Sequence, residues 1–169
     1  MEHNVQPLSF SKTPINILMA DDDDDDRGFF QRALKAIPIS TQFNEVIDGE
    51  KLITYLRSDI NELPTILFLD CNMPRKSGIE CLLEMQLDER LKLIPVIIYS
   101  TSMHEDIANL FYRTGAYYYI KKTNLTDLEF VLNKVLTMIL EKTFSRPERA
   151  NFIMNLSASK NATSNNHLC

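Results

Sequence analysis

Short apolar segments alternate with longer segments of mixed polarity along most of this chain. The clearest is ILFL at residues 66–69, which Pro64 opens and Asp70 closes. Short runs rich in branched and aromatic residues are typical of strands buried on both faces of a parallel sheet. We expect five strands, at residues 15–20, 41–47, 66–69, 96–99 and 117–120. The second is the least apolar, so it is expected at an edge of the sheet.

Between and after these strands, apolar residues recur three and four positions apart, which is the period of a helix buried on one face. The first helix is expected to end at Pro38 and the fourth at Gly115. The apolar faces of the five expected helices are Phe30, Ala33, Leu34 and Ile37; Leu52, Ile53 and Leu56; Ile79, Leu82 and Leu83; Ile107, Leu110 and Phe111; and Leu128, Leu132, Val135 and Ile139. This alternation predicts an α/β fold with a doubly wound, parallel, five-stranded sheet.

The length of 169 residues suits one domain of ordinary size. Residues 1–14 are polar and contain two prolines, so we expect a flexible N-terminal arm there. The folded domain is expected over residues 15–142. Residues 143–169 are rich in Asn, Ser, Ala and Thr and are expected to form a polar C-terminal tail, in which the apolar residues from Phe152 to Leu156 indicate one short docked helix.

The net charge of −5 comes from one acidic block rather than from the whole chain. Six of the 23 acidic residues are consecutive, at Asp21–Asp26, which leaves 17 acids against 18 bases elsewhere. The chain therefore carries a single acidic focus. No basic run stands out, so we expect no binding to nucleic acid.

The three cysteines, Cys71, Cys81 and Cys169, lack the spacing of a disulfide framework or a zinc site. Cys71 and Cys81 lie in apolar surroundings and are expected to be buried thiols. The N-terminus has no secretory signal, and no apolar run approaches the roughly 20 residues of a membrane helix. We therefore expect a cytoplasmic protein with no membrane segment.

Polar side chains follow four of the expected strands. Asp21 and Asp22 follow the first, Asp70 the third, Ser100 the fourth and Lys122 the fifth. In parallel sheets the carboxyl ends of the strands form the functional edge, so these side chains should meet. Converging carboxylates repel one another unless a cation lies between them, and an all-oxygen site with few protein ligands suits Mg²⁺, with Mn²⁺ as a substitute. A lysine and a hydroxyl beside a nucleophilic carboxylate would hold a phosphate, which indicates a site that makes an aspartyl phosphate.

Each of these residues also has an ordinary structural explanation. Asp70 alone could be a loop or N-cap carboxylate, and Ser100 could be an ordinary hydroxyl at the end of a strand. Asp24–Asp26 are expected at the start of the first helix, where carboxylates complement the helix dipole, and we expect their side chains to point away from the site.

Four motifs occur in order along the chain: ILMADD, ILFLDCNMPRKSG, PVIIYSTS and GAYYYIKK. From about Ile15 to Leu140, the chain resembles the receiver domain of bacterial two-component response regulators. The resemblance implies a flavodoxin-like (βα)5 fold. It also implies the roles of seven residues: Asp70 as phosphoacceptor, Asp22 as direct metal ligand, Asp21 as a ligand acting largely through water, Asn72 as donor of a backbone carbonyl, Ser100 as the hydroxyl that follows the phosphoryl group, Tyr119 as the aromatic that changes rotamer with it, and Lys122 as the lysine that pairs with the phosphate.

One position departs from the family. Thr123 follows the lysine where members of the family usually have a proline, often with a cis bond. A cis bond before threonine would cost about 3 kcal/mol, so the loop should be trans and differently shaped. Lys121 is adjacent, and the alternation of side chains along the strand should decide which lysine faces the site.

The resemblance implies a stand-alone response regulator rather than an enzyme. Its partner would be a sensor histidine kinase or a phosphotransfer protein, and the wording of the motifs is similar to that of regulators that serve phytochrome-like kinases. We also expect a homodimer through residues 103–140, because Tyr112, Tyr117 and Tyr118 lie there among charged residues.

Two other functions compete with this one. A phosphatase of the haloacid-dehalogenase type also uses an aspartate, a hydroxyl, a lysine and magnesium, but it needs a second aspartate two residues after the nucleophile. That position is Asn72, which cannot transfer a proton. The other alternative is an interaction module with the receiver fold that accepts no phosphate.

Overall fold

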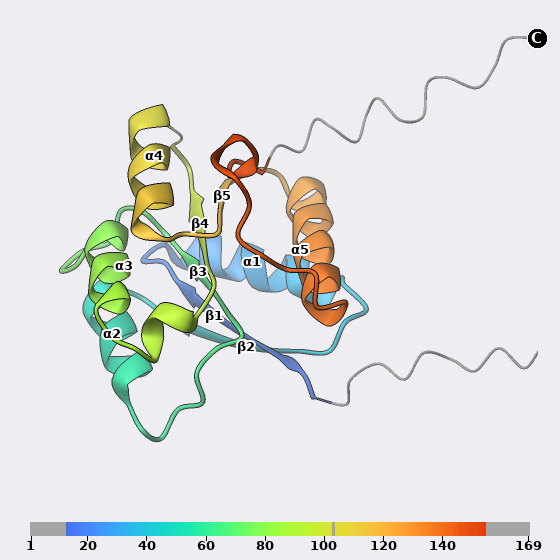
Figure 1. Cartoon of the computed structure of the whole chain (residues 1–169). Coiled ribbons are helices and arrows are strands. Elements are labelled where there is room, and N and C mark those ends of the chain that lie inside the picture. Colours follow the sequence, from blue (N-terminus) through green and yellow to red (C-terminus); the bar gives the residue numbers. More distant parts are fainter. Residues whose placement is uncertain (1–12, 103, 155–169) are drawn as a thin grey trace, which may run out of the picture.

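The computed structural model describes residues 13–102 and 104–154, and Figure 1 shows their arrangement. The five strands are β1 (Ile15–Ala20), β2 (Thr41–Val46), β3 (Ile66–Leu69), β4 (Val96–Ser100) and β5 (Tyr118–Lys121). They form one parallel sheet in the order β2-β1-β3-β4-β5. The predicted flavodoxin-like fold is therefore confirmed. β4 and β5 each end one residue later than expected, because Ser100 and Lys121 are still paired in register.

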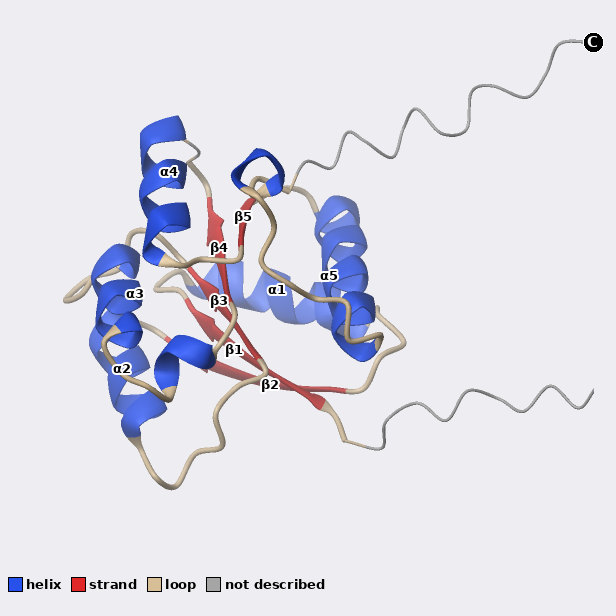
Figure 2. Ribbon diagram, in the orientation of Figure 1, coloured by secondary structure: helices blue, strands red, loops and turns tan. Residues whose placement is uncertain are grey.

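Five helices cover the sheet, α1 (Asp24–Lys35), α2 (Gly49–Arg57), α3 (Gly78–Gln86), α4 (Glu105–Thr114) and α5 (Leu125–Leu140). α1 and α5 lie on one face, and α2, α3 and α4 lie on the other (Figure 2). In the described part of the chain, no helix combines the length and the apolar character that a membrane crossing requires.

Two apolar layers hold the sheet between the helices. The side chains of β3 are at most 1% exposed, and alternate ones enter opposite layers. On the α1 and α5 side, the Phe30 ring lies 4.7 Å from that of Phe68 and 5.6 Å from that of Tyr99. Burial of such aromatic side chains stabilises the fold by about 2 kcal/mol or more each.

Two of the expected helical faces differ in part from the structure. In α3, Leu82 is buried as expected, but Leu83 is 50% exposed, and Cys81 and Met85 are buried as well. In α4, Ile107 and Leu110 are 41% and 38% exposed, whereas Ala108 and Phe111 are buried. The small side chains of Cys81 and Ala108 let both helices lie close to the sheet, and spacing among the larger apolar residues did not reveal this.

After α5, residues 143–154 turn back along the β5 edge of the sheet (Figure 1). We call these residues the docked segment. They contain the short 3-10 helix Arg149–Asn151, and Ile153 forms a parallel bridge with Tyr119. Residues 1–12 of the expected arm and residues 155–169 of the expected tail, including Cys169, lie outside the described residues. Cys71 and Cys81 are free and buried, as expected.

Candidate functional site

The sheet brings the predicted site residues to one edge. Asp21 follows β1, Asp70 follows β3, Ser100 ends β4 and Lys122 follows β5. The backbone N–H of Asp70 donates to the carbonyl of Ala20 at 2.9 Å, and the N–H of Lys122 donates to that of Ser100 at 2.8 Å. Hydrogen bonds of the sheet therefore fix the backbone on both sides of the site.

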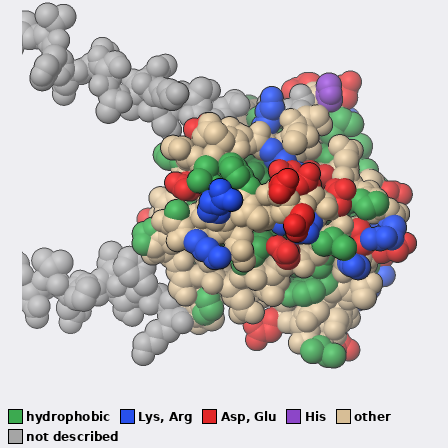
Figure 3. Space-filling model, turned by 180° about the vertical axis from the view of Figure 1, so that it is seen from behind, with side chains coloured by type: hydrophobic (Ala, Val, Ile, Leu, Met, Phe, Trp, Pro, Cys, Tyr) green, Lys and Arg blue, Asp and Glu red, His purple; other side chains and the backbone are tan. Residues whose placement is uncertain are grey.

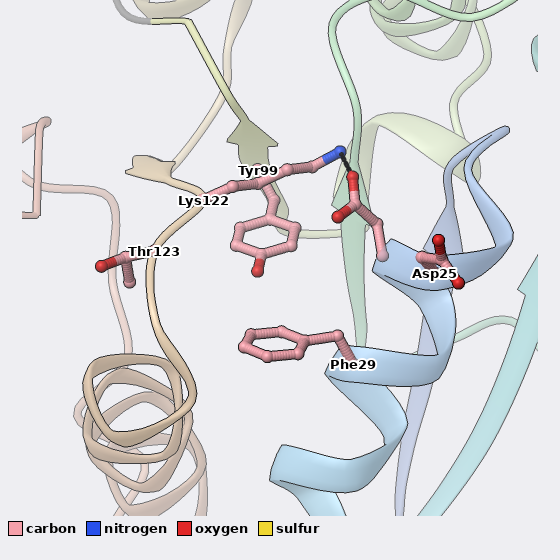
Figure 4. Close-up of a pocket in the computed structure, with 6 residues that line it drawn as sticks. Asp25, Phe29, Tyr99, Lys122 and Thr123 are labelled. Carbon is pink, nitrogen blue, oxygen red and sulfur yellow. Dashed lines mark hydrogen bonds and ion pairs between the residues drawn. The ribbon is translucent and has the colours of Figure 1, made fainter.

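The side chain of Lys122 lies at the centre of three carboxylates. Its Nζ is 2.7 Å from Asp21 Oδ2, 2.7 Å from Asp26 Oδ2 and 3.0 Å from Asp70 Oδ1. Its Nζ is also 5.6 Å from the centre of the Tyr99 ring, and Figure 4 shows the side chain extending past that ring toward α1. Three carboxylates surround one ammonium, so the site keeps an excess of negative charge.

Burial and charge act in opposite directions on the groups of this site. Burial opposes the charge of Lys122, but hydrogen bonds with Asp21 and Asp26, together with the charge of Asp70, hold its pKa well above the ordinary lysine value. Burial raises the pKa of Asp21, and its contact with Lys122 offsets part of that effect. Lys122 is therefore an ammonium ion at neutral pH.

Asp70 is 7% exposed and is held by its own loop. The backbone N–H of Asn72 donates to Asp70 Oδ2 at 2.8 Å. The loop returns so closely that a Cβ at Gly78 would lie 2.3 Å from the Asp70 carbonyl oxygen, which only glycine avoids. Ser77 then caps α3 in a capping box with Glu80. The residues after Asp70 thus fix both its backbone and its carboxylate.

An ion pair between the buried Asp48 and the half-exposed Arg75 attaches this loop to α2. Asp48 is fully buried, its Oδ1 accepts the N–H of Lys51 at 2.8 Å, and its Oδ2 pairs with the guanidinium of Arg75. Arg75 has a left-handed backbone, with φ at 67°. Its hydrogen bond holds the pKa of Asp48 below the usual value. The sequence does not predict this pair, because a partner 27 residues away has no local signature.

The acidic block divides differently from the prediction. Asp24–Asp26 begin α1, and Asp23 caps it by accepting the N–H groups of Asp25 and Asp26. The expectation that all three first-turn side chains point away from the site is wrong for Asp26, which contacts Lys122. Asp26 lies one helical turn before Phe30, on the buried face of α1. The spacing of four residues between Asp26 and the buried Phe30 was the feature of the sequence that could have placed Asp26 on the inner face of the helix.

Arg27 is a second residue that the sequence analysis missed. It is 7% exposed, and its Nη1 donates to the backbone carbonyl of Asp21 at 2.8 Å. Its Nη2 donates to Asp24 at 2.7 Å. Arg27 therefore fixes the backbone that carries Asp21, from a position three residues before Phe30 on the same helical face.

The position of Asp26 gives a testable consequence. We expect Asp26→Asn to make the Lys122 amine several-fold more reactive toward acetylation at neutral pH, because loss of one neighbouring carboxylate lowers the pKa of the ammonium. The matched control is Asp25→Asn, which removes a neighbouring exposed charge. Peptide mass spectrometry measures both rates. Equal Lys122 reactivity in the two variants would show that Asp26 does not hold the lysine.

The side chains of Asp22 and Asn72 are exposed. Within residues 13–102 and 104–154, no three acidic, histidine or cysteine side chains are arranged to hold a metal by themselves. The residues present nevertheless suit a hard cation. Asp21 Oδ2 is buried, and its contact among the described residues is the Lys122 ammonium at 2.7 Å, so an oxygen of this carboxylate is directed into the site. Carboxylate and carbonyl oxygens are the donors that Mg²⁺ prefers.

Ser100 and Tyr119 lie behind Asp70. Ser100 is 1% exposed, and its Oγ has no hydrogen-bond partner in the described structure. The Tyr119 side chain is fully buried; its hydroxyl donates to the Ser102 carbonyl at 2.6 Å and lies 3.5 Å from Cys71 Sγ. Burial raises the pKa of Tyr119 above its ordinary value, so the phenol stays neutral. Cys71 therefore connects the loop of Asp70 to Tyr119.

The alternation along β5 decides between the two lysines. Lys121 is exposed, and Lys122 enters the site. The described part of the chain contains no cis peptide bond, so the bond before Thr123 is trans. Beside Lys122 is a hollow of about 320 Å³, lined by Asp25, Asp26, Phe29, Tyr99, Lys122 and Thr123 (Figure 4). Figure 3 shows acidic side chains grouped near basic ones on the face opposite the view of Figure 1.

Residues 17–133 match the model of the response regulator receiver domain. Response regulator Rcp1 from Synechocystis sp. is 30% identical over 136 residues, which are 78% of this chain and 92% of Rcp1. The Mn²⁺-bound form of Rcp1 superposes with a TM-score of 0.69 at 30% identity and covers 79% of this chain and 99% of its own. The phosphorylated cyanobacterial phytochrome response regulator RcpA gives 0.70 at 30% identity, over 80% of this chain and 99% of its own.

Proposed function

This chain belongs to the response regulator receiver domain family, and from that premise we propose that it accepts a phosphoryl group on Asp70 and signals by a change of conformation. Receiver domains are signalling proteins rather than enzymes in the usual sense. The observation that carries the proposal is the buried carboxylate of Asp70, in contact with Lys122 at the functional edge of the sheet. RcpA, whose structure is that of a phosphorylated protein, supports it.

The step is a displacement at phosphorus. A carboxylate oxygen of Asp70 forms a bond to the phosphorus of the donor, and the bond from phosphorus to the leaving group breaks. The leaving group keeps the electron pair and takes a proton from solvent. The Asn72 N–H and the Lys122 ammonium orient the carboxylate before the reaction, and an oriented nucleophile lowers the barrier.

Mg²⁺ or Mn²⁺ would be held by Asp21, Asp22, Asp70 and the backbone carbonyl of Asn72. The Mn²⁺-bound Rcp1 structure supports the choice of ion. When bound, such an ion neutralises charge on the transferring phosphoryl group. Arg27 and the Asp48–Arg75 pair would keep the backbone of these ligands in place.

Lys122 and Ser100 would hold the product. The Lys122 ammonium can leave Asp70 Oδ1 and pair with a phosphate oxygen, and the unpartnered Ser100 hydroxyl can donate to another. Tyr119, whose hydroxyl donates a hydrogen bond to the carbonyl of Ser102, would then repack. We propose these movements as the change that transmits the signal.

The phosphoryl donor would be a sensor histidine kinase or a phosphotransfer protein. The relation to RcpA, a phytochrome response regulator, supports a phytochrome-like kinase as the specific partner. The hollow beside Lys122 leaves one side of the site open to such a donor.

The experiment is incubation of the protein with phosphoramidate and Mg²⁺, followed by intact-mass measurement. We expect stable incorporation of one phosphoryl group per chain. Continuous release of phosphate without a labelled protein would support the phosphatase, although the amide of Asn72 cannot act as its acid and base. No reaction at all would support an interaction module that accepts no phosphate.

The expected homodimer through residues 103–140 meets a finding that the sequence did not reveal. The Tyr112 hydroxyl donates to the Pro147 carbonyl at 3.3 Å, and the Phe144 ring lies 5.7 Å from the rings of Tyr117 and Tyr118. The chain's own docked segment therefore covers the aromatic residues on which the dimer prediction rested. We propose that the dimer is the phosphorylated form, in which this face is accessible.

Sedimentation velocity tests that proposal. We expect the protein treated with phosphoramidate and Mg²⁺ to sediment as a dimer at concentrations where the untreated protein is a monomer. Asp70→Asn under the same treatment is the control and should stay monomeric. A treated protein that carries phosphate and remains a monomer at high concentration would contradict the dimer.

A further inference from the structure

The docked segment binds the sheet through the residue proposed as the switch. The backbone N–H of Tyr119 donates to the Phe152 carbonyl at 2.9 Å, and the N–H of Met154 donates to the Tyr119 carbonyl at 2.9 Å. β5 is an edge strand, and an uncovered edge strand is a template for pairing with another chain. The segment pairs with the backbone N–H and carbonyl groups of this edge at Tyr119.

Side chains fix the segment to α4 and β5. Phe152 is fully buried, with its ring centre 5.2 Å from that of Tyr112 and 6.2 Å from that of Tyr119. Arg149 Nε donates to Asn109 Oδ1 at 2.6 Å, and the Arg149 guanidinium also pairs with Glu105. An aromatic anchor with polar contacts around it is the pattern of a recognition interface.

A second arginine makes the attachment specific. Arg146 Nε donates to the Ala116 carbonyl at 3.0 Å, and its guanidinium lies 4.3 Å from the centre of the Tyr112 ring. The segment thus reaches α4 and the turn before β5 through three anchors, Arg146, Arg149 and Phe152.

The contact on the α5 side is looser. A hollow of about 420 Å³ lies between α5 and the later part of the segment, and it is lined by Tyr118, Lys134, Met138, Ala150, Asn151, Ile153 and Met154. Immediately before the segment, Lys142 has a left-handed backbone with φ at 57°, which is unfavourable for a residue with a side chain. The hollow beside α5 and the left-handed backbone of Lys142 indicate where the segment can separate from the domain.

We propose that the docked segment is a built-in cover of the β5 edge and of α4 that is released when Asp70 is phosphorylated. This inference rests on the function proposed above and names the element that the site controls. Release exposes Tyr112 and the edge of β5, which is the surface that the dimer needs.

The linkage passes through a short series of contacts. When the Ser100 hydroxyl turns to a phosphate on Asp70, the end of β4 moves with it, and the Ser102 carbonyl lies two residues further along the same segment. That carbonyl accepts the hydrogen bond from Tyr119 at 2.6 Å. Tyr119 contacts Phe152 through its ring and its backbone, so repacking of Tyr119 removes the contacts that hold the Phe152 side chain in place. By reciprocity, loss of the segment must also favour the phosphorylated state.

Hydrogen exchange of the full-length protein tests the proposal. With phosphoramidate and Mg²⁺, we expect the amides of residues 144–154 to exchange about tenfold faster than in the untreated protein, since undocking removes their protection. Intact mass of the same sample reports how much of the protein carries phosphate. A sample that is fully phosphorylated and keeps its slow exchange would overturn the proposal while leaving the proposed function intact.

A second comparison needs no phosphate. Phe152→Ala removes the anchor, and Phe130→Ala, which removes a half-exposed ring from α5, is the matched control. Without any donor, we expect the amides of residues 98–102 to exchange several-fold faster in Phe152→Ala than in Phe130→Ala. The reason is reciprocity: if the end of β4 affects docking of the segment, loss of docking must also affect the end of β4. Equal exchange in the two variants would disprove the linkage even if the protein took up no phosphate.

Dilution tests whether the segment that covers each domain comes from the same chain or from a second copy. A cover supplied by the same chain keeps residues 144–154 protected at every protein concentration. Protection that disappears on dilution, together with dissociation of a dimer, would show that a second copy supplies the segment and would overturn the intramolecular cover.

Discussion

The Asp70→Asn variant is expected to take up no phosphate from phosphoramidate, whereas the unmodified protein takes up one phosphoryl group per chain. An amide is not a nucleophile toward phosphorus, and Asp70 is the carboxylate that contacts both Lys122 and the Asn72 N–H. The change keeps the shape of the side chain, so the fold should persist, with an unfolding free energy within about 1 kcal/mol of the original.

Asp25→Asn is the control for this result, because it removes an exposed carboxylate of the same block. It should still take up one phosphoryl group per chain. Intact mass measures labelling, and circular dichroism checks the fold. Phosphate uptake by folded Asp70→Asn at the normal stoichiometry would mean that another residue is the acceptor.

The largest effect on stability is expected from Lys122→Met. The change keeps an unbranched side chain that is one atom shorter, but it leaves Asp21, Asp26 and Asp70 without their common counter-ion. Removal of one partner from a buried ion pair costs about 3 kcal/mol. Urea unfolding at neutral pH measures the loss, and Lys121→Met, which changes the exposed neighbour, should cost little.

The loss in Lys122→Met should also depend on pH. Burial already raises the pKa of Asp21, and removal of the ammonium raises it further. A carboxyl whose folded pKa lies above its unfolded value contributes its full stability below the unfolded pKa, and this contribution is lost as the pH rises through the folded pKa. The deficit should therefore be greatest at neutral pH and shrink as the pH falls. A deficit that is constant with pH would mean that the lost packing of the lysine, rather than its charge, is responsible.

The strands were predictable because each is a short apolar run closed by a polar residue. β3 is buried on both faces, so nearly every residue in it had to be apolar. The buried faces of α3 and α4 were harder to predict, since small residues such as Cys81 and Ala108 take the positions nearest the sheet. Hydrophobic spacing weights large residues and overlooks these.

The candidate site was predictable where a residue directly follows a strand, as Asp21, Asp70 and Lys122 do. It was not predictable where a partner comes from a helix or a distant loop. Asp26 enters from α1, and Arg75 reaches Asp48 from the loop after β3. In a run of six identical residues, composition alone cannot tell which members face inward.

The docked segment was the part least accessible to sequence reasoning. Its polar composition indicates a tail, but single residues decide its position. Phe152 fills a place beside Tyr119, and Arg146 and Arg149 bind backbone and side-chain oxygens of the α4 region. Such contacts between distant parts of the chain leave no local periodicity.

One measurement tests the central claim most directly, which is that Asp70 is the phosphoacceptor. The protein is treated with phosphoramidate and Mg²⁺, the acyl phosphate is reduced with borohydride, and peptides are sequenced by mass spectrometry. We expect the modification at Asp70 alone, at one per chain. Modification at another carboxylate, or an Asp70 peptide that remains unmodified while the protein carries phosphate, would contradict the account.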